Sequence, residues 1–196
     1  MIVLLATKNR GKLRELSALF GGSQLDVKLP EDIGAKMPEV KEDGNTFKEN
    51  AVKKATALAA ASGQWALADD SGLEVEVLGG APGVRSARFA GPYAGDEANT
   101  RKLLKILRSA RNRKAKFRCV LALAKPTGEV LTADGFLEGE IGKTPLGEGG
   151  FGYDPVFYLV GRTITVAMIS FEEKQRISHR AKAAQKLLSL LPKFLT

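Results

Sequence analysis

Short apolar runs alternate with helical patterns along this chain of 196 residues, and this alternation constrains the fold most strongly. The chain opens with a continuous apolar run from Ile2 to Ala6. Leucines at helical spacing follow until Gly21 and Gly22 stop the pattern. A buried strand that leads directly into an amphipathic helix is typical of α/β proteins, so the opening of the chain already predicts that class.

The same mixture continues to the end of the chain. Residues 46–49 have the pattern of a capping box, so we expect an alanine-rich helix that begins there and ends near Gly63. Residues 126–128, with sequence PTG, predict a hairpin turn. Further strands are expected over 25–29, 65–68, 73–77, 117–124, 129–136 and 156–160, and further helices over 96–107 and from Ser178 to just before Pro192. We expect residues 1–196 to form a single α/β domain with a mixed, twisted sheet and flanking helices.

The charge and cysteine content limit the partners. A net charge of +8, from 30 Lys plus Arg against 22 Asp plus Glu, admits nucleic acid, anionic lipid or a polyanionic small substrate. The densest basic run, residues 108–116, has no interleaved aromatic side chain for base stacking, so we expect a solvated connector there. The single cysteine, Cys119, excludes a disulfide framework. We expect a cytoplasmic protein with neither a signal peptide nor a membrane span, and with no nucleic acid and no membrane as partners.

A polar loop joins the first expected strand to the first expected helix. Backbone amides at a helix N-terminus carry partial positive charge and suit phosphate, and a lysine adds a full charge. The loop is not a Walker A motif, because a single glycine precedes the lysine and Leu13 stands where Ser or Thr would bind magnesium. An ordinary strand-to-helix turn is the alternative. The candidate phosphate-binding residues are Thr7, Lys8, Asn9, Arg10, Gly11 and Lys12.

Two adjacent aspartates give a stronger signal. Asp69 and Asp70 follow the apolar residues 65–68, and the ends of strands are where sheet proteins usually place their sites. Successive side chains on a strand point to opposite faces, so we expect the two aspartates to play different roles. Magnesium prefers oxygen ligands and is usually held by one or two protein carboxylates. The alternative is a turn that is capped by an aspartate.

Residues 42–44, with sequence EDG, offer further carboxylates just before the helix that is expected from residue 46. Glu42 would complete a metal site, whereas compensation of the helix dipole by acidic residues is equally consistent with this position. Lys53 and Lys54 lie on the same helix. We expect one of these lysines to reach phosphate and the other to be solvated.

Residues 147–155, with sequence GEGGFGYDP, place glycines around two aromatic residues. Glycine lets the backbone approach a flat ligand closely. Phe151 and Tyr153 can stack on a base, and Asp154 can accept its hydrogen bonds. A structural turn is the alternative, but such a turn does not require so much glycine beside two aromatic side chains.

Lys174 and the sequence Ser178-His179-Arg180 stand at the start of the last expected helix. His179 is the single histidine of the chain, and a lone histidine is more often structural than functional. Here an N-cap serine precedes it and an arginine follows it, so the three residues would present donors together. Such donors suit a purine carbonyl or a phosphate.

Taken together and in this order, these stretches resemble the inosine triphosphate pyrophosphatase family, also called XTP/dITP diphosphatases. The resemblance runs nearly from end to end of the chain. The motifs that carry it are residues 6–12 (ATKNRGK), 68–73 (ADDSGL), 78–84 (LGGAPGV), 86–89 (SARF), 149–155 (GGFGYDP), 173–174 (EK) and 177–180 (ISHR).

The resemblance implies two lobes around a nucleotide-binding cleft, a homodimer, and Mg²⁺-dependent hydrolysis of ITP, dITP and XTP to the monophosphate and pyrophosphate. It implies that Asp70 is the proton acceptor and a metal ligand, with Asp69 and Glu42 as further candidate ligands, and that Ser71 touches the substrate. Phosphate contacts are implied for residues 7–12 and Lys54. Contacts with the base and sugar are implied for Phe151, Gly152, Tyr153, Asp154, Lys174, His179 and Arg180.

One position departs from the family pattern. Many members carry a metal-binding glutamate where this chain has Lys41, and Glu42 follows one place later. Two alternatives to the implied activity stay open. One is the related pyrophosphatase class that acts on modified pyrimidine or methylated nucleotides, against which residues 178–180 argue. The other is a nucleic-acid-binding module that uses the basic surface and has no place for turnover of ITP.

Overall fold

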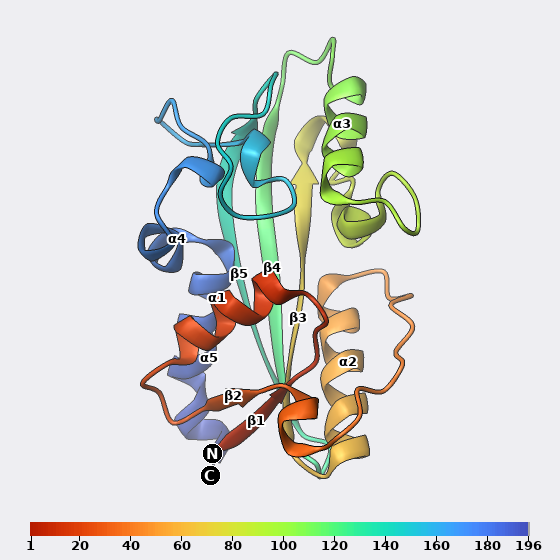
Figure 1. Cartoon of the computed structure of the whole chain (residues 1–196), viewed down its shortest axis with the longest axis vertical. Helices are drawn as coiled ribbons and strands as arrows, with labels where there is room; N and C mark the ends of the chain where they lie inside the picture. The colour runs from red at the N-terminus through yellow and green to blue at the C-terminus, as the bar shows by residue number, and fades with distance from the viewer. Residues whose placement is uncertain (196) are drawn as a thin grey trace. The chain divides into compact units, whose positions relative to one another are not determined.

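The structure, a computed structural model, describes residues 1–195 and contains a six-stranded sheet with the order β2-β1-β3-β4-β5-β6 (Figure 1). β1 pairs in parallel with β2 and β3, whereas β5 and β6 are antiparallel, so the sheet is mixed. This confirms the predicted α/β class. The strands are β1 (Ile2–Leu5), β2 (Asp26–Lys28), β3 (Trp65–Val75), β4 (Lys114–Ala124), β5 (Val130–Ile141) and β6 (Phe157–Leu159). The helices are α1 (Arg10–Phe20), α2 (Phe47–Ser62), α3 (Asp96–Ile106), α4 (Phe171–Ile177) and α5 (His179–Leu195).

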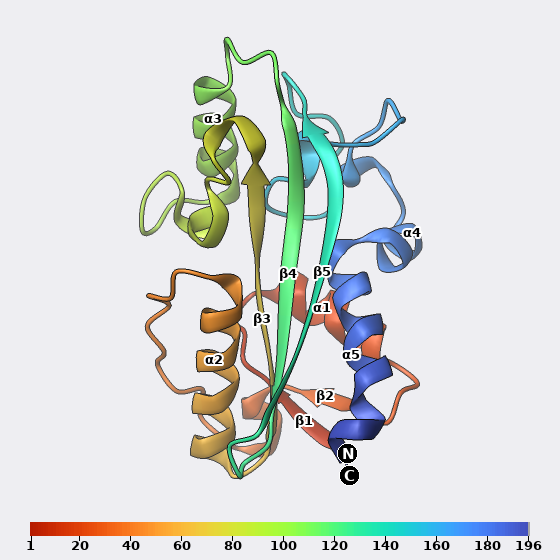
Figure 2. The ribbon, with the colours of Figure 1, turned by 180° about the vertical axis from the view of Figure 1, so that it is seen from behind.

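The chain divides into two compact units, and β3, β4 and β5 contribute residues to both. Unit 1 comprises Met1–Asp70, Cys119–Gly135 and the segment from His179 onward. Its strands carry α1 and α5 on one side and α2 on the other (Figures 1 and 2). Its core joins these strands to α1 and α5 through buried apolar residues that include Val3, Leu5, Leu16, Phe20, Leu67, Leu121 and Leu187.

Unit 2 comprises Ser71–Arg118 and Phe136–Ser178. Phe117 of β4 stacks on Phe157 of β6 with ring centroids 4.3 Å apart. The same core contains buried residues of β3, α3 and β5, including Leu73, Leu103, Leu107 and Ile141. α3 covers one side of these strands, and α4 lies on the other (Figure 2).

Local sequence signals explain where α2 begins and ends. The Thr46 hydroxyl accepts a hydrogen bond from the Glu49 amide at 3.1 Å, and the Glu49 carboxylate accepts one from the Asn45 amide at 2.7 Å. The first bond satisfies an amide of the first helical turn, and the second holds the amide that precedes the N-cap residue Thr46. The helix ends at Gly63, whose φ of 64° is the left-handed conformation that glycine adopts most readily. The predicted Thr46 cap and helix end are confirmed, but the Glu49 carboxylate accepts from the Asn45 amide and not from the Thr46 amide that a capping box would use.

β3 differs from the prediction of two short strands on either side of residues 69–72. It is continuous from Trp65 to Val75, and its end at Val75 leaves residues 76–78 as a short 3₁₀ helix. Asp69 and Asp70 are 1% and 6% exposed, so they lie inside an extended strand rather than at a solvated turn. Oppositely charged side chains that come from distant parts of the chain allow this burial.

Three other elements differ from the predictions. The last helix does not stop before Pro192 but continues through it, because a proline in a final turn removes one hydrogen bond while the buried Leu187 and Leu191 still hold the helix on the core. α4 was not predicted. The basic run 108–116 is a connector only in part, since β4 begins at Lys114. No helix within residues 1–195 has the length and apolar character needed to cross a membrane.

Gly135 permits close packing of α5 on β5 in unit 1. A Cβ atom there would clash with the backbone of His179 and Ala183. We expect Gly135→Ser to lower the free energy of unfolding by about 3 kcal/mol, because the helix backbone cannot yield as a flexible side chain would. Urea denaturation would measure the loss. Gly95→Ser is the control: its Cβ meets open space and serine suits the N-cap of α3, so an equal loss there would contradict the packing argument.

Candidate active site

The polar loop between β1 and α1 has a local hydrogen-bonded structure. The Asn9 side chain caps α1 by accepting from the Lys12 amide at 3.0 Å, and the Thr7 hydroxyl accepts from the Asn9 amide at 3.1 Å. Lys8 of this loop and Arg10, the first residue of α1, are exposed. The loop therefore directs the start of α1 and turns Lys12 toward β3.

Asp69 and Asp70 lie on β3 just beyond the point where its parallel partner ends. The register pairs Leu5 with Leu67, and the Ala6 amide donates to the Leu67 carbonyl oxygen at 2.8 Å. The aspartates thus follow the carboxyl end of the parallel pair, which is the position that open α/β sheets use for binding sites. The prediction placed them after the end of their own strand, but β3 continues through them, and it is the parallel partner β1 that ends before them.

Asp69 is the centre of a buried network in unit 1. Its Oδ1 lies 2.5 Å from the Lys12 ammonium, and its Oδ2 accepts from Arg180 Nε at 2.7 Å. Arg180 also pairs through Nη1 with Glu15, which stands one helical turn after Lys12. The Cys119 thiol donates to Oδ2 at 3.1 Å. Burial opposes the charged form, but Arg180 and Lys12 outweigh it and hold the pKa of Asp69 well below its usual range.

Asp70 has a different environment, as the alternation of a strand predicts. Its Oδ1 accepts from the Lys54 ammonium of α2 at 2.8 Å, and its Oδ2 accepts from Asn50 Nδ2 at 3.4 Å. Burial raises the pKa of Asp70 above its usual value, although Lys54 and Lys12 pull it in the opposite direction. Asp70 is therefore the aspartate whose surroundings tolerate a charge least.

Glu42 joins the same group from the loop before α2. Its carboxylate lies 3.0 Å from the Lys54 ammonium. The loop is held close to α2 because the Gly44 amide donates to the Asn50 side chain at 2.8 Å, and a Cβ on Gly44 would lie 2.6 Å from that oxygen. Lys41 points elsewhere: its side chain is 86% exposed and lies 4.0 Å from the Asp43 carboxylate.

The donor set fits a divalent cation. Glu42 and Asp70 bring two carboxylates to one ammonium, and magnesium is commonly held by one or two protein carboxylates together with substrate phosphates and water. Asp69 fits less well, because both of its oxygens are already paired with buried or partly buried cations. No group of three or more His, Cys, Asp or Glu side chains with metal-site geometry occurs among residues 1–195.

In unit 2, the glycine-rich loop is held by one carboxylate of its own and one from α3. Asp154 accepts from the Phe151 amide at 2.9 Å and pairs with the buried Lys174 at 2.5 Å. Asp96 of α3 accepts from the Gly152 amide at 2.6 Å. A Cβ on Gly150 would clash with the Asp154 carboxylate. Glycine at position 150 therefore lets this carboxylate come close enough to accept from the Phe151 amide.

The aromatic residues of the loop have separate environments. The Lys174 ammonium lies 4.8 Å from the centroid of the Phe151 ring, a cation–π distance. The Tyr153 hydroxyl donates to the Ser86 carbonyl oxygen at 2.9 Å, and burial, with a smaller contribution from Asp96, raises the pKa of Tyr153. Tyr153 thus anchors the loop, and Phe151 is the half-buried ring.

The structure brings together most of the predicted residues, each within its own unit. Ser71 is half-buried on β3, and His179 is buried at the first residue of α5. Sequence reasoning missed Glu15, Asn50, Asp96 and Cys119. The sequence could have indicated Glu15, because it follows Lys12 by three residues on a helix and therefore lies on the same helical face.

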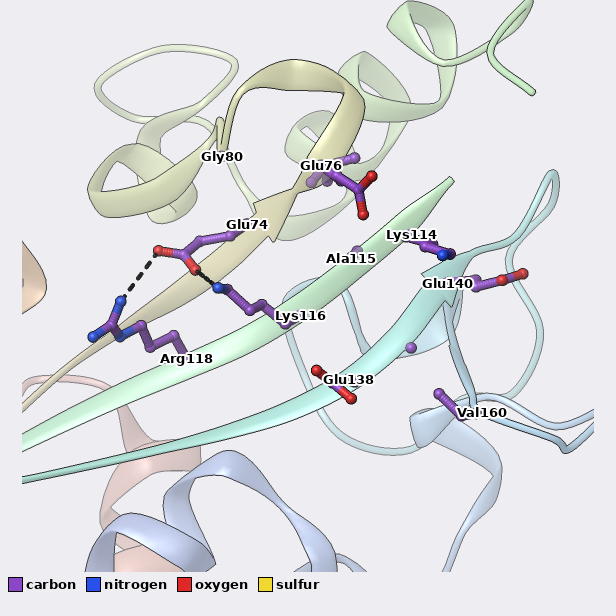
Figure 3. A pocket seen from close by; sticks show the side chains of 12 residues that line it. Glu74, Glu76, Gly80, Lys114, Ala115, Lys116, Arg118, Glu138, Glu140 and Val160 are labelled. Carbon is purple, nitrogen blue, oxygen red and sulfur yellow. Dashed lines mark ion pairs between the residues drawn. The ribbon is translucent and has the colours of Figure 1, made fainter. Parts of the chain in front are cut away.

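A groove of about 760 Å³ in unit 2 is separate from these groups (Figure 3). Glu74 of β3 pairs there with Lys116 at 3.2 Å and lies 3.9 Å from Arg118, both on β4. Glu138 and Glu140 of β5 line it as well. None of the predicted site residues lines it, and its cross-strand ion pairs are those of a solvated sheet face.

The fold and these groups define an α/β protein with carboxylates and lysines gathered at the end of a parallel strand pair, a constellation suited to phosphate and a divalent cation. The profile of the Ham1 family matches residues 3–190, and the chain belongs to that family. It is 51% identical to the dITP/XTP pyrophosphatase of Desulforamulus reducens, over 97% of this chain and 96% of that protein.

Solved structures agree. The Ham1 protein of Staphylococcus aureus superposes with a TM-score of 0.86 at 40% identity, over 99% of this chain and 100% of that one. The HAM1 protein of Coxiella burnetii superposes with a TM-score of 0.88 at 38% identity, over 98% of this chain and 99% of that one. The family resemblance and the α/β fold that it implies are confirmed.

The two aspartates should respond oppositely to neutralisation. Asp69→Asn removes a charge that compensates buried Arg180, so we expect a loss of roughly 3–5 kcal/mol in the free energy of unfolding. Asp70→Asn should leave stability unchanged or raise it at neutral pH, because a carboxyl with a raised pKa costs stability while it is ionised. Urea denaturation in a chelating buffer would compare them. Equal losses in both variants would contradict the assigned roles.

Proposed function

We propose that this protein hydrolyses the triphosphates of non-standard purine nucleosides, such as ITP, dITP and XTP, to the monophosphate and pyrophosphate. The observation that carries the proposal is the convergence of Glu42 and Asp70 on Lys54, beside the pair of Lys12 and Asp69. This arrangement matches what a triphosphate requires, which is oxygen ligands for a divalent cation and lysines for the phosphate oxygens. Relatives that are about half identical are named dITP/XTP pyrophosphatases, which supports the choice of substrate.

Glu42 and Asp70 would hold magnesium, which when bound polarises phosphate oxygens and neutralises their charge. Water attacks the α-phosphorus, and Lys12 and Lys54 stabilise the negative charge that develops on the departing pyrophosphate. Asp70, or a water that it orients, receives the proton of the attacking water. Asp69 suits this role less well, because its two oxygens are paired with Lys12 and Arg180.

Asp69 acts through Lys12 and not on the substrate. One of its oxygens fixes the Lys12 ammonium, and the other is fixed by Arg180, which Glu15 holds in turn. Lys12 is thus presented in a defined position without a loss of side-chain entropy on binding. For Arg180 these contacts support a positioning role, in place of the direct contact with the base that the resemblance implies.

The glycine-rich loop of unit 2 is proposed to bind the purine base. Phe151 offers a ring for stacking, and the tethers from Asp96 and Asp154 keep the loop backbone in place. His179 and backbone amides are proposed to donate to a carbonyl at the purine 6-position. An amino group there, as in ATP, would leave such donors unpaired, which is costly in a buried site. The homodimer and the cytoplasmic location remain predictions.

A panel of nucleotides would test the function. We expect magnesium-dependent release of pyrophosphate from ITP, dITP and XTP, with kcat/KM roughly 10²–10⁴ above that for ATP. An Asp70→Asn preparation, expected to lose at least roughly 10² in rate, controls for contaminating enzymes. Equal kcat/KM for ITP and ATP would defeat the substrate assignment. Full activity in excess chelator would defeat the metal requirement, and preference for modified pyrimidine nucleotides would favour the related pyrophosphatase class.

Lys12→Ala should weaken catalysis for all triphosphates alike. A lysine near phosphate recognises charge and carries no information about the base, and one charge-assisted hydrogen bond corresponds to roughly 10–100-fold in kcat/KM. Steady-state kinetics on ITP, XTP and ATP would show whether their ratios hold. Lys48→Ala, at an exposed position of α2, is the control. A change in base preference for Lys12→Ala alone would refute its assignment to phosphate.

A further inference from the structure

The Lys54 ammonium occupies the place between the two carboxylates that are proposed to hold the cation. It lies 2.8 Å from Asp70 Oδ1, 3.0 Å from Glu42 Oε1 and 2.9 Å from the Asp69 carbonyl oxygen. The side chains of Lys54 and Asp70 are 11% and 9% exposed, whereas that of Glu42 is 36% exposed. Water therefore screens Asp70 poorly and Glu42 only in part.

Two converging carboxylates repel each other unless a cation lies between them, and burial of Asp70 strengthens this repulsion. Lys54 supplies that cation, since its ammonium lies at hydrogen-bond distance from both carboxylates. A magnesium ion that bridges Asp70 Oδ1 and Glu42 Oε1 would lie about 2.1 Å from each oxygen, in the position that the Lys54 ammonium holds between them. Two cations this close repel each other, so ammonium and metal compete for this position.

We propose that Lys54 is an internal counter-ion that keeps the two-carboxylate site neutralised, and that it releases Glu42 and Asp70 when a divalent cation binds them. The proposal rests on the metal site of the proposed function and adds a role for Lys54 before substrate arrives. Once displaced, the ammonium keeps its bond to the Asp69 carbonyl oxygen and turns its remaining donors to phosphate. A lysine suits this exchange, since its charge is compact and its stem has four rotatable bonds.

Lys12 does not share this role. Its ammonium pairs with the Asp69 carboxylate and lies 3.5 Å from the Asp69 carbonyl oxygen, whereas Lys54 contacts the carboxylates of both Glu42 and Asp70. Lys53 pairs with Asp43 at 2.6 Å, and both of these side chains are nearly half exposed. Solvent screens such a pair, so its loss should not affect the metal site.

The exchange predicts that the protein alone binds magnesium weakly and that removal of Lys54 strengthens binding. Isothermal titration with MgCl₂, without nucleotide, should give Lys54→Met roughly tenfold higher affinity than the parent, within the usual range of coupling between sites. Lys54→Gln should behave likewise and serves if the methionine variant does not fold. Lys53→Met should match the parent. Adding Glu42→Gln to Lys54→Met should abolish the gain.

A second readout separates exchange from a general effect of charge. In ¹⁵N NMR, the ammonium signal that is absent from Lys54→Met should broaden or exchange faster with water when MgCl₂ is added to the parent. An unchanged Lys54 signal at saturating magnesium, or equal or weaker magnesium binding by both Lys54 variants, would overturn the proposal. Both measurements omit nucleotide, so failure to hydrolyse ITP would refute the proposed function while leaving this inference to be judged separately.

Discussion

The pairing of the buried Asp69 carboxylate with Lys12 and Arg180 is the interaction on which unit 1 depends. A charge without solvent is tolerated only when it is paired and hydrogen-bonded, and Asp69 meets this condition with groups from three elements: Lys12 of α1, Arg180 of α5 and Cys119 of β4. The network therefore connects the start of α1 and the start of α5 to the middle of β3. It stabilises the packing and at the same time fixes a lysine for the site.

Asp70 shows how one strand serves two chemical purposes. Its neighbour points to the opposite face and is fixed by cations, whereas Asp70 faces Lys54 and Asn50, where burial raises its pKa. The different roles of the pair follow from the period of a strand and were predictable. Which aspartate takes which role depends on Arg180. This residue is far away in the sequence, and the family resemblance implied that it contacts the purine base.

Local patterns in the sequence predicted the helix ends and strands that depend on interactions between neighbouring residues. The N-cap at Thr46, the helix end at Gly63 and the strands around the parallel pair depend on neighbouring residues, and the structure confirms them. The continuity of β3 through Asp69 and Asp70 could not be predicted in this way, since an isolated pair of aspartates favours a turn. Charges from Lys12, Lys54 and Arg180 make the extended conformation possible, and no local pattern reveals those pairings.

The charge balance of the site gives a physical reason for a metal. Lys12, Lys54 and Arg180 pair with the carboxylates of Glu15, Glu42, Asp69 and Asp70, so this network carries one net negative charge when all of its members are ionised. The +8 of the whole chain therefore lies elsewhere and can raise the rate of encounter with an anion, but it does not neutralise a triphosphate at this place. A bound divalent cation would make the net charge of the network positive. The lysines alone cannot neutralise a triphosphate there, because the carboxylates already balance their charges.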